Sequence, residues 1–512
     1  MRQWLLVSVV AVSCLFSCKD AFVKPQRHYT LSSFSTYSRD EYRIASSSLM
    51  KHVARMASED KGSLVADRHV RSYYQNGGRC LWVRRSGVSQ QADTLVSFLR
   101  TVSEMGFSPR VFRLADIEHD MQCLRQLDVS SSSSDINVIM ARLEYNLTKA
   151  YLRYAVGQHF GFTNPEVMFN RLDQRDQDST STRVVYRRLY DVPIKRANDD
   201  FFQSALRKAV TDSIGMFLRE IQPENKLYYT LLAQLRKQPV HGEELVRLLC
   251  NMERCRWRQN DYPQNHRKYV FVNLPAYHLW AFDGDSVLEM HVGCGTQKTK
   301  TPLLNSAIKR MEINPQWVIP HSILKTDIVQ HAGDSSYFAR HHYFIRHRKS
   351  GEKVDVRHIG PSQLLSGIYS VVQEGGAGNS LGRVVFRFDN NFSVFLHDTS
   401  TRAFFGRDNR GVSHGCVRVE KPFELAVFLL NEKDESLIDK IRYSMTVDLA
   451  EEGNGRQLIN YARLIRVKSV EPQVPLFISY YTLYPDPTGR LVTYPDIYGY
   501  DRVMFPYLKK FL

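Results

Sequence analysis

Two short stretches of the sequence combine residue types that can turn a cysteine into a nucleophile. The first, 396–398, closes an alternating apolar run with a histidine and an aspartate, and the second, 413–418, reads Ser-His-Gly-Cys-Val-Arg. A thiol of ordinary pKa is mostly protonated at neutral pH, so Cys416 needs a base or a positive neighbourhood before it can attack. The two stretches therefore predict covalent catalysis by a thiol.

Two histidines are candidates for the base that activates Cys416. His414 stands two residues away, where an extended backbone projects both side chains to the same side but limits their approach. His397 ends a separate predicted strand, from which the ring can reach the sulfur with freedom to turn. We favour His397 as the base, with Asp398 or a nearby backbone carbonyl fixing its tautomer.

The remaining motif residues suit a substrate with a carbonyl and a carboxylate. Gly415 lets the backbone come close to the substrate, and its amide together with that of Cys416 could form an oxyanion hole. Arg418 offers a fixed fork of donors that matches a carboxylate.

The periodicity of the chain predicts an α+β protein of several domains. With 512 residues, of which 43% are hydrophobic, the chain can bury two or three cores. Residues 40–262 are mostly helical in pattern, and the period changes to two in 263–505, which predicts a strand-rich domain. An insertion at 321–366 interrupts the strands, and within it we expect a basic, helix-like segment at 339–346; insertions of this kind are often lids.

The N-terminus predicts export. Arg2 precedes an apolar run at 4–16 that is too short to span a bilayer and suits a signal peptide covering 1–17. The run ends in Leu-Phe-Ser-Cys, which resembles a lipobox and marks Cys18 as a lipid-attachment site followed by a tether at 18–39. An ordinary cleaved signal peptide is the alternative. With Lys19 after Cys18, we expect a lipid-anchored protein on the periplasmic face of the outer membrane of a Gram-negative-type bacterium.

The two site stretches resemble the signature of the YkuD-type L,D-transpeptidases, in which a histidine lies about sixteen residues before a Ser/Thr-His-Gly-Cys segment. Further stretches are similar to the YcbB-like subgroup of that family, and they cover most of the mature chain: 147–154, 269–292, 301–302, 314–320, 378–383 and 494–499. Related chains often carry a peptidoglycan-binding helical module, which we expect to be absent here because 227–257 runs almost directly into the strand region.

The resemblance implies an enzyme that attacks the L-to-D bond after the third residue of a peptidoglycan tetrapeptide stem. It would release D-alanine, hold an acyl group on its cysteine, and pass that group to a stem amine to form a 3→3 cross-link, without a metal or cofactor. The nucleophile falls on Cys416 and the base on His397, while Ser413, His414, Gly415 and Arg418 fall on positions that line the site. The insertion corresponds to a lid, and carbapenems are the expected inhibitors.

Several alternatives stay open at this point. Water as acceptor would make the protein an L,D-carboxypeptidase, and a protein lysine would make it a wall-anchoring enzyme. A wall-binding lipoprotein without catalysis is the competing hypothesis from another class. A zinc site built from His291, Cys294, His414 and Cys416 lacks the usual ligand spacing. The net charge of +16 suits an anionic partner, but export and the lack of a recognition motif argue against nucleic acid.

Overall fold

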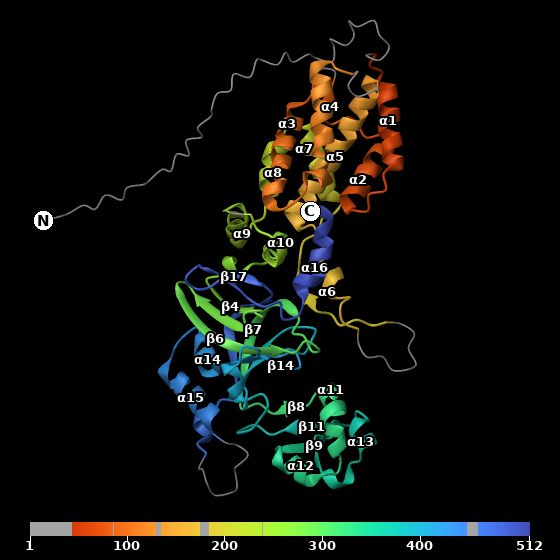
Figure 1. The fold of residues 1–512 in the computed structure, drawn as a ribbon. Coiled ribbons are helices and arrows are strands. Elements are labelled where there is room, and N and C mark those ends of the chain that lie inside the picture. The colour runs from red at the N-terminus through yellow and green to blue at the C-terminus, as the bar shows by residue number, and fades with distance from the viewer. Residues whose placement is uncertain (1–42, 85–86, 130–134, 175–183, 238, 448–458) are drawn as a thin grey trace, which may run out of the picture. The chain divides into compact units, whose positions relative to one another are not determined.

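The computed structural model describes residues 43–84, 87–129, 135–174, 184–237, 239–447 and 459–512 (Figure 1). The predicted signal peptide, the lipid-attachment residue Cys18 and the tether lie outside these residues. No helix within the described ranges has both the length and the apolar character to cross a bilayer. The chain divides into two compact units, and the first takes its residues from Met1–Arg100, Phe112–Arg153 and Ser204–Phe217.

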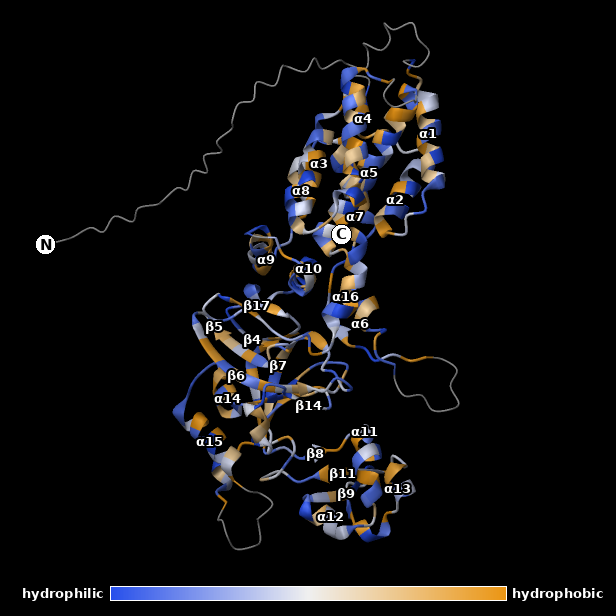
Figure 2. Cartoon of the chain, viewed as in Figure 1, coloured by the Kyte–Doolittle hydropathy of each residue, from blue (hydrophilic) through white to orange (hydrophobic). Residues whose placement is uncertain are grey.

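The first unit is built from helices. Their apolar residues recur every three or four positions, so that each helix buries one face, and Figure 2 shows orange and blue residues alternating around them. In α5, Ile139, Leu143, Leu147 and Tyr151 are fully buried. The unit draws on α1 (Ser46–Glu59), α2 (Val65–Gln75), α3 (Gln90–Arg100), α4 (Leu114–Gln126), α5 (Ile136–Phe160), α7 (Asp199–Val210), α8 (Ile214–Glu220) and the short pair β1 (Val83–Arg84) and β2 (Gly87–Val88).

A buried carboxylate on α5 fixes the segment that follows α2. Glu144 is fully buried and accepts hydrogen bonds from the amides of Leu81, Trp82 and Val83 at 2.6, 2.9 and 3.1 Å. The hydroxyl of Tyr74 donates to it at 2.7 Å. Four donors satisfy a charge that would otherwise be costly to bury.

The second unit is organised around a sheet that closes on itself. The strands follow the order β12-β13-β15-β6-β5-β4-β16-β7-β3. Strand β12 also pairs with β7, which closes the path from β12 to β7, and β3 is an additional neighbour of β7. The strand-rich pattern predicted for 263–505 begins with the antiparallel meander β4–β6. The strands are β3 (Tyr190–Asp191), β4 (Lys268–Asn273), β5 (His278–Asp283), β6 (Ser286–Gly295), β7 (Leu303–Ile313), β12 (Val384–Phe388), β13 (Leu396–His397), β14 (Gly411–Ser413), β15 (Val417–Val419) and β16 (Val467–Ser479).

Side chains from every strand of the closed path pack into one apolar core. Strand residues such as Val272, Met290, Leu396 and Val417 belong to it, and successive residues point to the opposite face. The remaining elements of the unit are α6 (Pro165–Phe169), α9 (Lys226–Lys237), α10 (Gly242–Arg256), α14 (Pro422–Leu429), α15 (Glu435–Thr446), α16 (Tyr500–Leu508) and the hairpin of β17 (Leu483–Pro485) and β18 (Leu491–Thr493).

The insertion has a sheet and a core of its own. Strands β8 (Trp317–Val318), β9 (Tyr343–His347), β10 (Lys353–Val354) and β11 (Tyr369–Gln373) pair in the order β10-β9-β11-β8, and they carry the helices α11 (His321–Ile323), α12 (Ser335–Arg340) and α13 (Pro361–Leu365), teal in Figure 1. The expected helix at 339–346 is wrong beyond Arg340. The helix α12 ends at Arg340, and β9 follows because Ile345 pairs with Val371 in the small core.

The helical region followed by a mostly-β region confirms the predicted fold class. The boundary expected near residue 262 falls between α10 and β4, and as a domain boundary it stays a prediction.

The carboxylate of Glu144 generates a test of stability. Glu144→Ala removes the acceptor of three buried amides, and a buried donor without a partner costs about 1–3 kcal/mol. We expect the free energy of unfolding of the first unit to fall by about 3–5 kcal/mol in urea denaturation followed by circular dichroism. Glu118→Ala is the matched control, because Glu118 pairs with Arg100 at the surface, and it should change stability by less than about 0.5 kcal/mol. Equal losses for both variants would contradict the role of Glu144.

Candidate active site

Two short parallel strands bring the predicted base and nucleophile to one face of the sheet. In β13 and β15, Leu396 pairs with Val417 and His397 pairs with Arg418. Leu396 and Val417 are fully buried in the core, so the alternation of strand residues turns His397, Cys416 and Arg418 to the opposite face. The structure therefore places these three side chains on one face of the sheet, from adjacent strands, and their catalytic roles stay a prediction.

The segment before β13 contains less β-strand than the sequence predicts. Hydrogen bonds from one asparagine shape the loop in its place. The strand predicted to end at His397 consists of Leu396 and His397 alone, and Ser393 adopts a left-handed backbone with φ of 54°. The side chain of Asn390 accepts from the amides of Phe392 and Val394 at 2.9 and 3.1 Å and donates to the carbonyl of Val394 at 2.7 Å. This loop presents the carbonyl of Ser393 to the sulfur of Cys416 at 4.0 Å.

His397 is held as a neutral imidazole. The ring is 4% exposed, and its Nδ1 donates to the backbone carbonyl of Asp398 at 2.5 Å, which leaves Nε2 as the acceptor. Burial lowers the pKa of His397 to about 4; the charge of Arg418 acts in the same direction, and the carbonyls of Asp398 and Leu381 oppose it. At neutral pH the ring can accept a proton without first losing one.

The carboxylate of Asp398 forms a hydrogen bond with a backbone amide instead of with His397. Its Oδ2 accepts from the amide of Arg383 at 2.8 Å, and its Oδ1 lies 3.1 Å from Nη1 of Arg402. A Cβ at Gly382 would lie 2.5 Å from this carboxylate, so only glycine permits the approach. Of the two alternatives for orienting His397, the structure provides the backbone carbonyl.

Cys416 is a partly exposed thiol that is protonated in the free protein. Burial raises its pKa, while the amide of Phe395 and the charges of Arg418 and Arg387 lower it by less. A neutral thiol thus faces a neutral imidazole. No thiolate–imidazolium pair exists in the free protein, so the proton of Cys416 passes to His397 only as the thiol attacks.

The turn that carries Cys416 has its own hydrogen bonds. The hydroxyl of Ser413 donates to the carbonyl of Cys416 at 2.6 Å and accepts from the amide of Gly415 at 3.1 Å. The amide of Gly415 is therefore engaged, whereas none of the described residues accepts from the amide of Cys416. Gly415 has φ of 122°, which only glycine adopts readily. The side chain of His414 is exposed.

Residues far along the chain fix the position of this turn. Thr301 donates to the carbonyl of Gly415 at 2.9 Å, and Thr299 donates to the carbonyl of Ser413 at 2.7 Å. The hydroxyl of Tyr498 accepts from the amide of Thr301 at 3.1 Å. Thr301 and Tyr498 lie far from the site stretches in the sequence, and only the structure shows that they hold the turn.

Arg418 leaves a donor available beside the thiol. Its guanidinium lies 5.7 Å from the centre of the Phe404 ring. Burial lowers its pKa, and its Nε is buried without a hydrogen-bond partner among the described residues. A buried donor left open in a site is poised to receive an acceptor from a ligand.

The zinc alternative finds no ligand set in the part of the chain that the structure describes. No group of three or more histidine, cysteine, aspartate or glutamate side chains there could hold a metal ion. Cys294 is buried in β6, where the hydroxyl of Tyr498 lies 3.4 Å from its sulfur.

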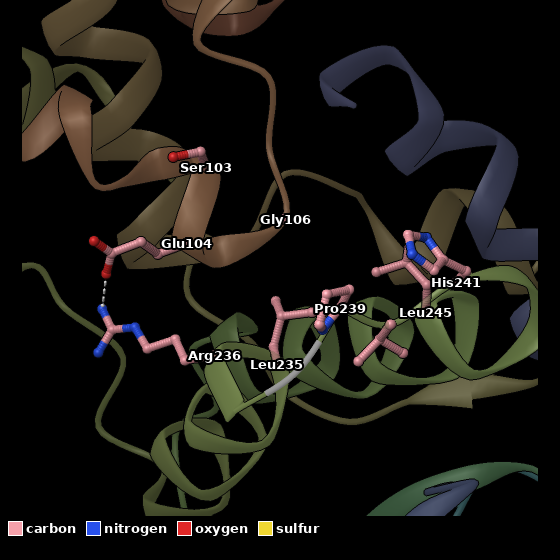
Figure 3. A pocket seen from close by; sticks show the side chains of 9 residues that line it. Ser103, Glu104, Gly106, Leu235, Arg236, Pro239, His241 and Leu245 are labelled. Atoms are coloured by element: carbon pink, nitrogen blue, oxygen red, sulfur yellow. Dashed lines mark ion pairs between the residues drawn. The ribbon is translucent and has the colours of Figure 1, made fainter.

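A separate cavity of about 630 Å³ lies within the second unit (Figure 3). Glu104 and Arg236 form an ion pair of 2.6 Å at its side. None of its lining residues belongs to the candidate site: Ser103, Glu104, Gly106, Leu235, Arg236, Pro239, Val240, His241 and Leu245.

Comparisons with known proteins match both regions of the chain. Residues 267–440 match the YkuD family, described as the L,D-transpeptidase catalytic domain, and residues 68–235 match the family described as the Scaffold domain. A Haemophilus influenzae protein named "Putative L,D-transpeptidase" is 28% identical over 313 residues, which cover 60% of this chain and 59% of that protein. The alignment thus spans about three fifths of that relative. The predicted resemblance to the YkuD family is confirmed at the level of the catalytic domain, which contains His397 and Cys416.

The raised pKa of Cys416 generates a test by alkylation. The rate of modification by iodoacetamide, read by mass spectrometry of the peptide that contains Cys416, should rise with pH and reach its midpoint above the ordinary thiol pKa. His397→Ala should change this rate less than about threefold at pH 7, because a neutral imidazole does not stabilise a thiolate. A plateau reached by pH 6–7, lost in His397→Ala, would show an ion pair and contradict this assignment.

Proposed function

We propose that this chain is a cysteine-dependent L,D-transpeptidase that joins peptidoglycan stem peptides by 3→3 cross-links. The observation that carries the proposal is the pairing of β13 with β15, which sets a neutral imidazole and a thiol on one face inside the region matched by the catalytic domain.

In the first half-reaction, the thiol of Cys416 attacks the carbonyl of the third stem residue. Nε2 of His397 accepts the thiol proton as the C–S bond forms. The C–N bond to D-alanine then breaks, and the imidazolium returns the proton to the leaving amine. A thioester on Cys416 and free D-alanine result.

In the second half-reaction, an amine of another stem attacks the thioester. His397 takes the proton that the nitrogen loses, the C–S bond breaks, and the thiol is restored with that proton. With the side-chain amine of a third-position residue as acceptor, the product is a 3→3 cross-link. Water in its place would yield a trimmed tripeptide, the L,D-carboxypeptidase outcome.

Two donors suit the charges that develop in these steps. The open amide of Cys416 can bind the oxyanion of the tetrahedral intermediate, and the unpaired Nε of Arg418 suits the carboxylate of the leaving D-alanine. Burial and Arg418 both disfavour a charged His397. The imidazolium is therefore short-lived, and its proton passes quickly to the leaving group.

The remaining expectations belong to this proposal. Assignment to the YcbB-like subgroup, lipid attachment at Cys18 and a periplasm-facing position on the outer membrane of a Gram-negative-type bacterium would bring the site to the wall. The insertion would act as a lid, and carbapenems would acylate Cys416.

Release of D-alanine tests the proposal directly. The purified protein, incubated with tetrapeptide-containing muropeptides, should release D-alanine and form cross-linked dimers that mass spectrometry identifies. Cys416→Ala should lower release by a factor of about 10³ or more. No release by the parent protein would favour a non-catalytic wall-binding protein, and tripeptides alone would favour the carboxypeptidase.

Acylation by a carbapenem tests the ranking of the two histidines. His397→Ala should slow formation of the covalent adduct by about 10²–10⁴-fold, because the buried ring is the proton acceptor. His414→Ala should slow it by less than about tenfold, since the ring is exposed. Intact-protein mass spectrometry over time measures both, and the reverse order of effects would assign the base to His414.

A further inference from the structure

An arginine lies in the same row of the sheet as the nucleophile, on the face that carries the site. In the pairing of β12 with β13, Val385 faces His397 and Phe386 faces Leu396, so Arg387 is the next residue and falls opposite Phe395. The amide of Val417 donates to the carbonyl of Phe395 at 3.0 Å, which continues the register toward Cys416. The row therefore runs from Arg387 over Phe395 to the thiol.

The guanidinium of Arg387 is held in place before any ligand arrives. Its Nε and Nη2 donate to Oε2 of Glu312 at 3.0 and 2.8 Å. Its Cζ lies 4.4 Å from the centre of the Phe395 ring. A side chain fixed by both a carboxylate and a ring loses little entropy on binding a further group.

One edge of this guanidinium remains open. The hydrogen bonds to Glu312 use Nε and Nη2, so Nη1 has no hydrogen-bond partner among the described residues. The side chain of Arg387 is 29% exposed. Glu312 does not depend on Arg387 alone, because Arg310 donates to its other oxygen at 3.2 Å.

The charge of Arg387 acts on the reacting groups. Together with Arg418 it lowers the pKa of both Cys416 and His397. Arg418 stands on β15 with the thiol, whereas Arg387 stands on β12, across the intervening strand β13. Two arginines on separate strands of the same face can bind two separate anionic groups of one ligand.

We propose that Arg387, stacked on Phe395 and braced by Glu312, binds a side carboxylate of the stem peptide through its open Nη1 edge. The inference rests on the proposed function, which supplies a donor stem with carboxylates besides the terminal one. The shared chemistry is a free carboxylate, carried by the second residue or by the side chain of the third. The site then prefers acidic stems over amidated ones.

Binding to an inactive full-length chain tests this contact without any turnover. In a Cys416→Ala background, calorimetry should give a Kd for the free-acid tetrapeptide about 10–100-fold lower than for a peptide amidated at the carboxylate that Arg387 holds. Peptides amidated at the second or at the third residue separate the two sources. Adding Arg387→Gln should raise the Kd for the free-acid peptide by a similar factor. The Kd for the amidated peptide should change by less than about threefold.

Arg310→Gln is the matched control, because Arg310 lies in the same row and pairs with the same glutamate but is farther from the thiol. It should change the Kd by less than about threefold. Equal affinity for free-acid and amidated peptides, or equal effects of Arg310→Gln and Arg387→Gln, would overturn the proposal. Circular dichroism confirms that each variant is folded.

Alkylation of the parent thiol separates binding from an effect on Cys416 itself. Arg387→Gln should change the rate of alkylation by uncharged iodoacetamide by less than about threefold. A fall in this rate as large as the fall in peptide affinity would show that Arg387 acts on the reactivity of the thiol and not on peptide binding. Failure of the proposed function would appear differently, as absent D-alanine release with an intact preference for free-acid peptides.

Discussion

The parallel pairing of β13 with β15 is the constraint on which the site depends. Leu396 and Val417 are drawn into the core by burial, and each fully buried aliphatic side chain contributes about 1.5–3 kcal/mol. Because strand residues alternate, this burial turns His397 and Cys416 outward together. A one-residue slip of either strand would send the nucleophile or the base into the core. The apolar core, closed by the pairing of β12 with β7, therefore fixes the geometry of the site.

Strands β13 and β15 are short, so few ladder hydrogen bonds fix the loops that flank them. Hydrogen bonds from side chains hold these loops instead. On one side, Asn390 bonds three backbone groups of the loop before β13. On the other, Thr301 donates to the carbonyl of Gly415 in the turn before β15, and the hydroxyl of Tyr498 accepts from the amide of Thr301. Both loops end against Cys416, so hydrogen bonds from three separate parts of the chain, at Asn390, Thr301 and Tyr498, set the position of the sulfur.

Much of this arrangement could be predicted from the sequence, because alternation and motif spacing are local properties. They predicted the helical and strand-rich regions, the insertion, and a position for His397 at the end of a strand separate from Cys416. Alternation could not reveal that Ser393 leaves the strand, since its left-handed backbone depends on Asn390. Nor could it predict that α12 gives way to β9, because that strand pairs along its whole length only with the distant strand β11. The bonds from Thr301 and Tyr498 join residues about a hundred or more positions apart, which no local pattern contains.

Burial of His397 appears at first to weaken the base that the proposed reaction needs. A pKa of about 4 makes the imidazole a poorer acceptor for the thiol proton, and the raised pKa of Cys416 adds to that cost. The same shift makes the imidazolium a stronger acid, and expulsion of D-alanine requires a proton on a poor leaving group. The environment of His397 thus favours protonation of the leaving D-alanine over deprotonation of the thiol. The approach of the substrate carbonyl to the thiol must offset the free-energy cost of that deprotonation.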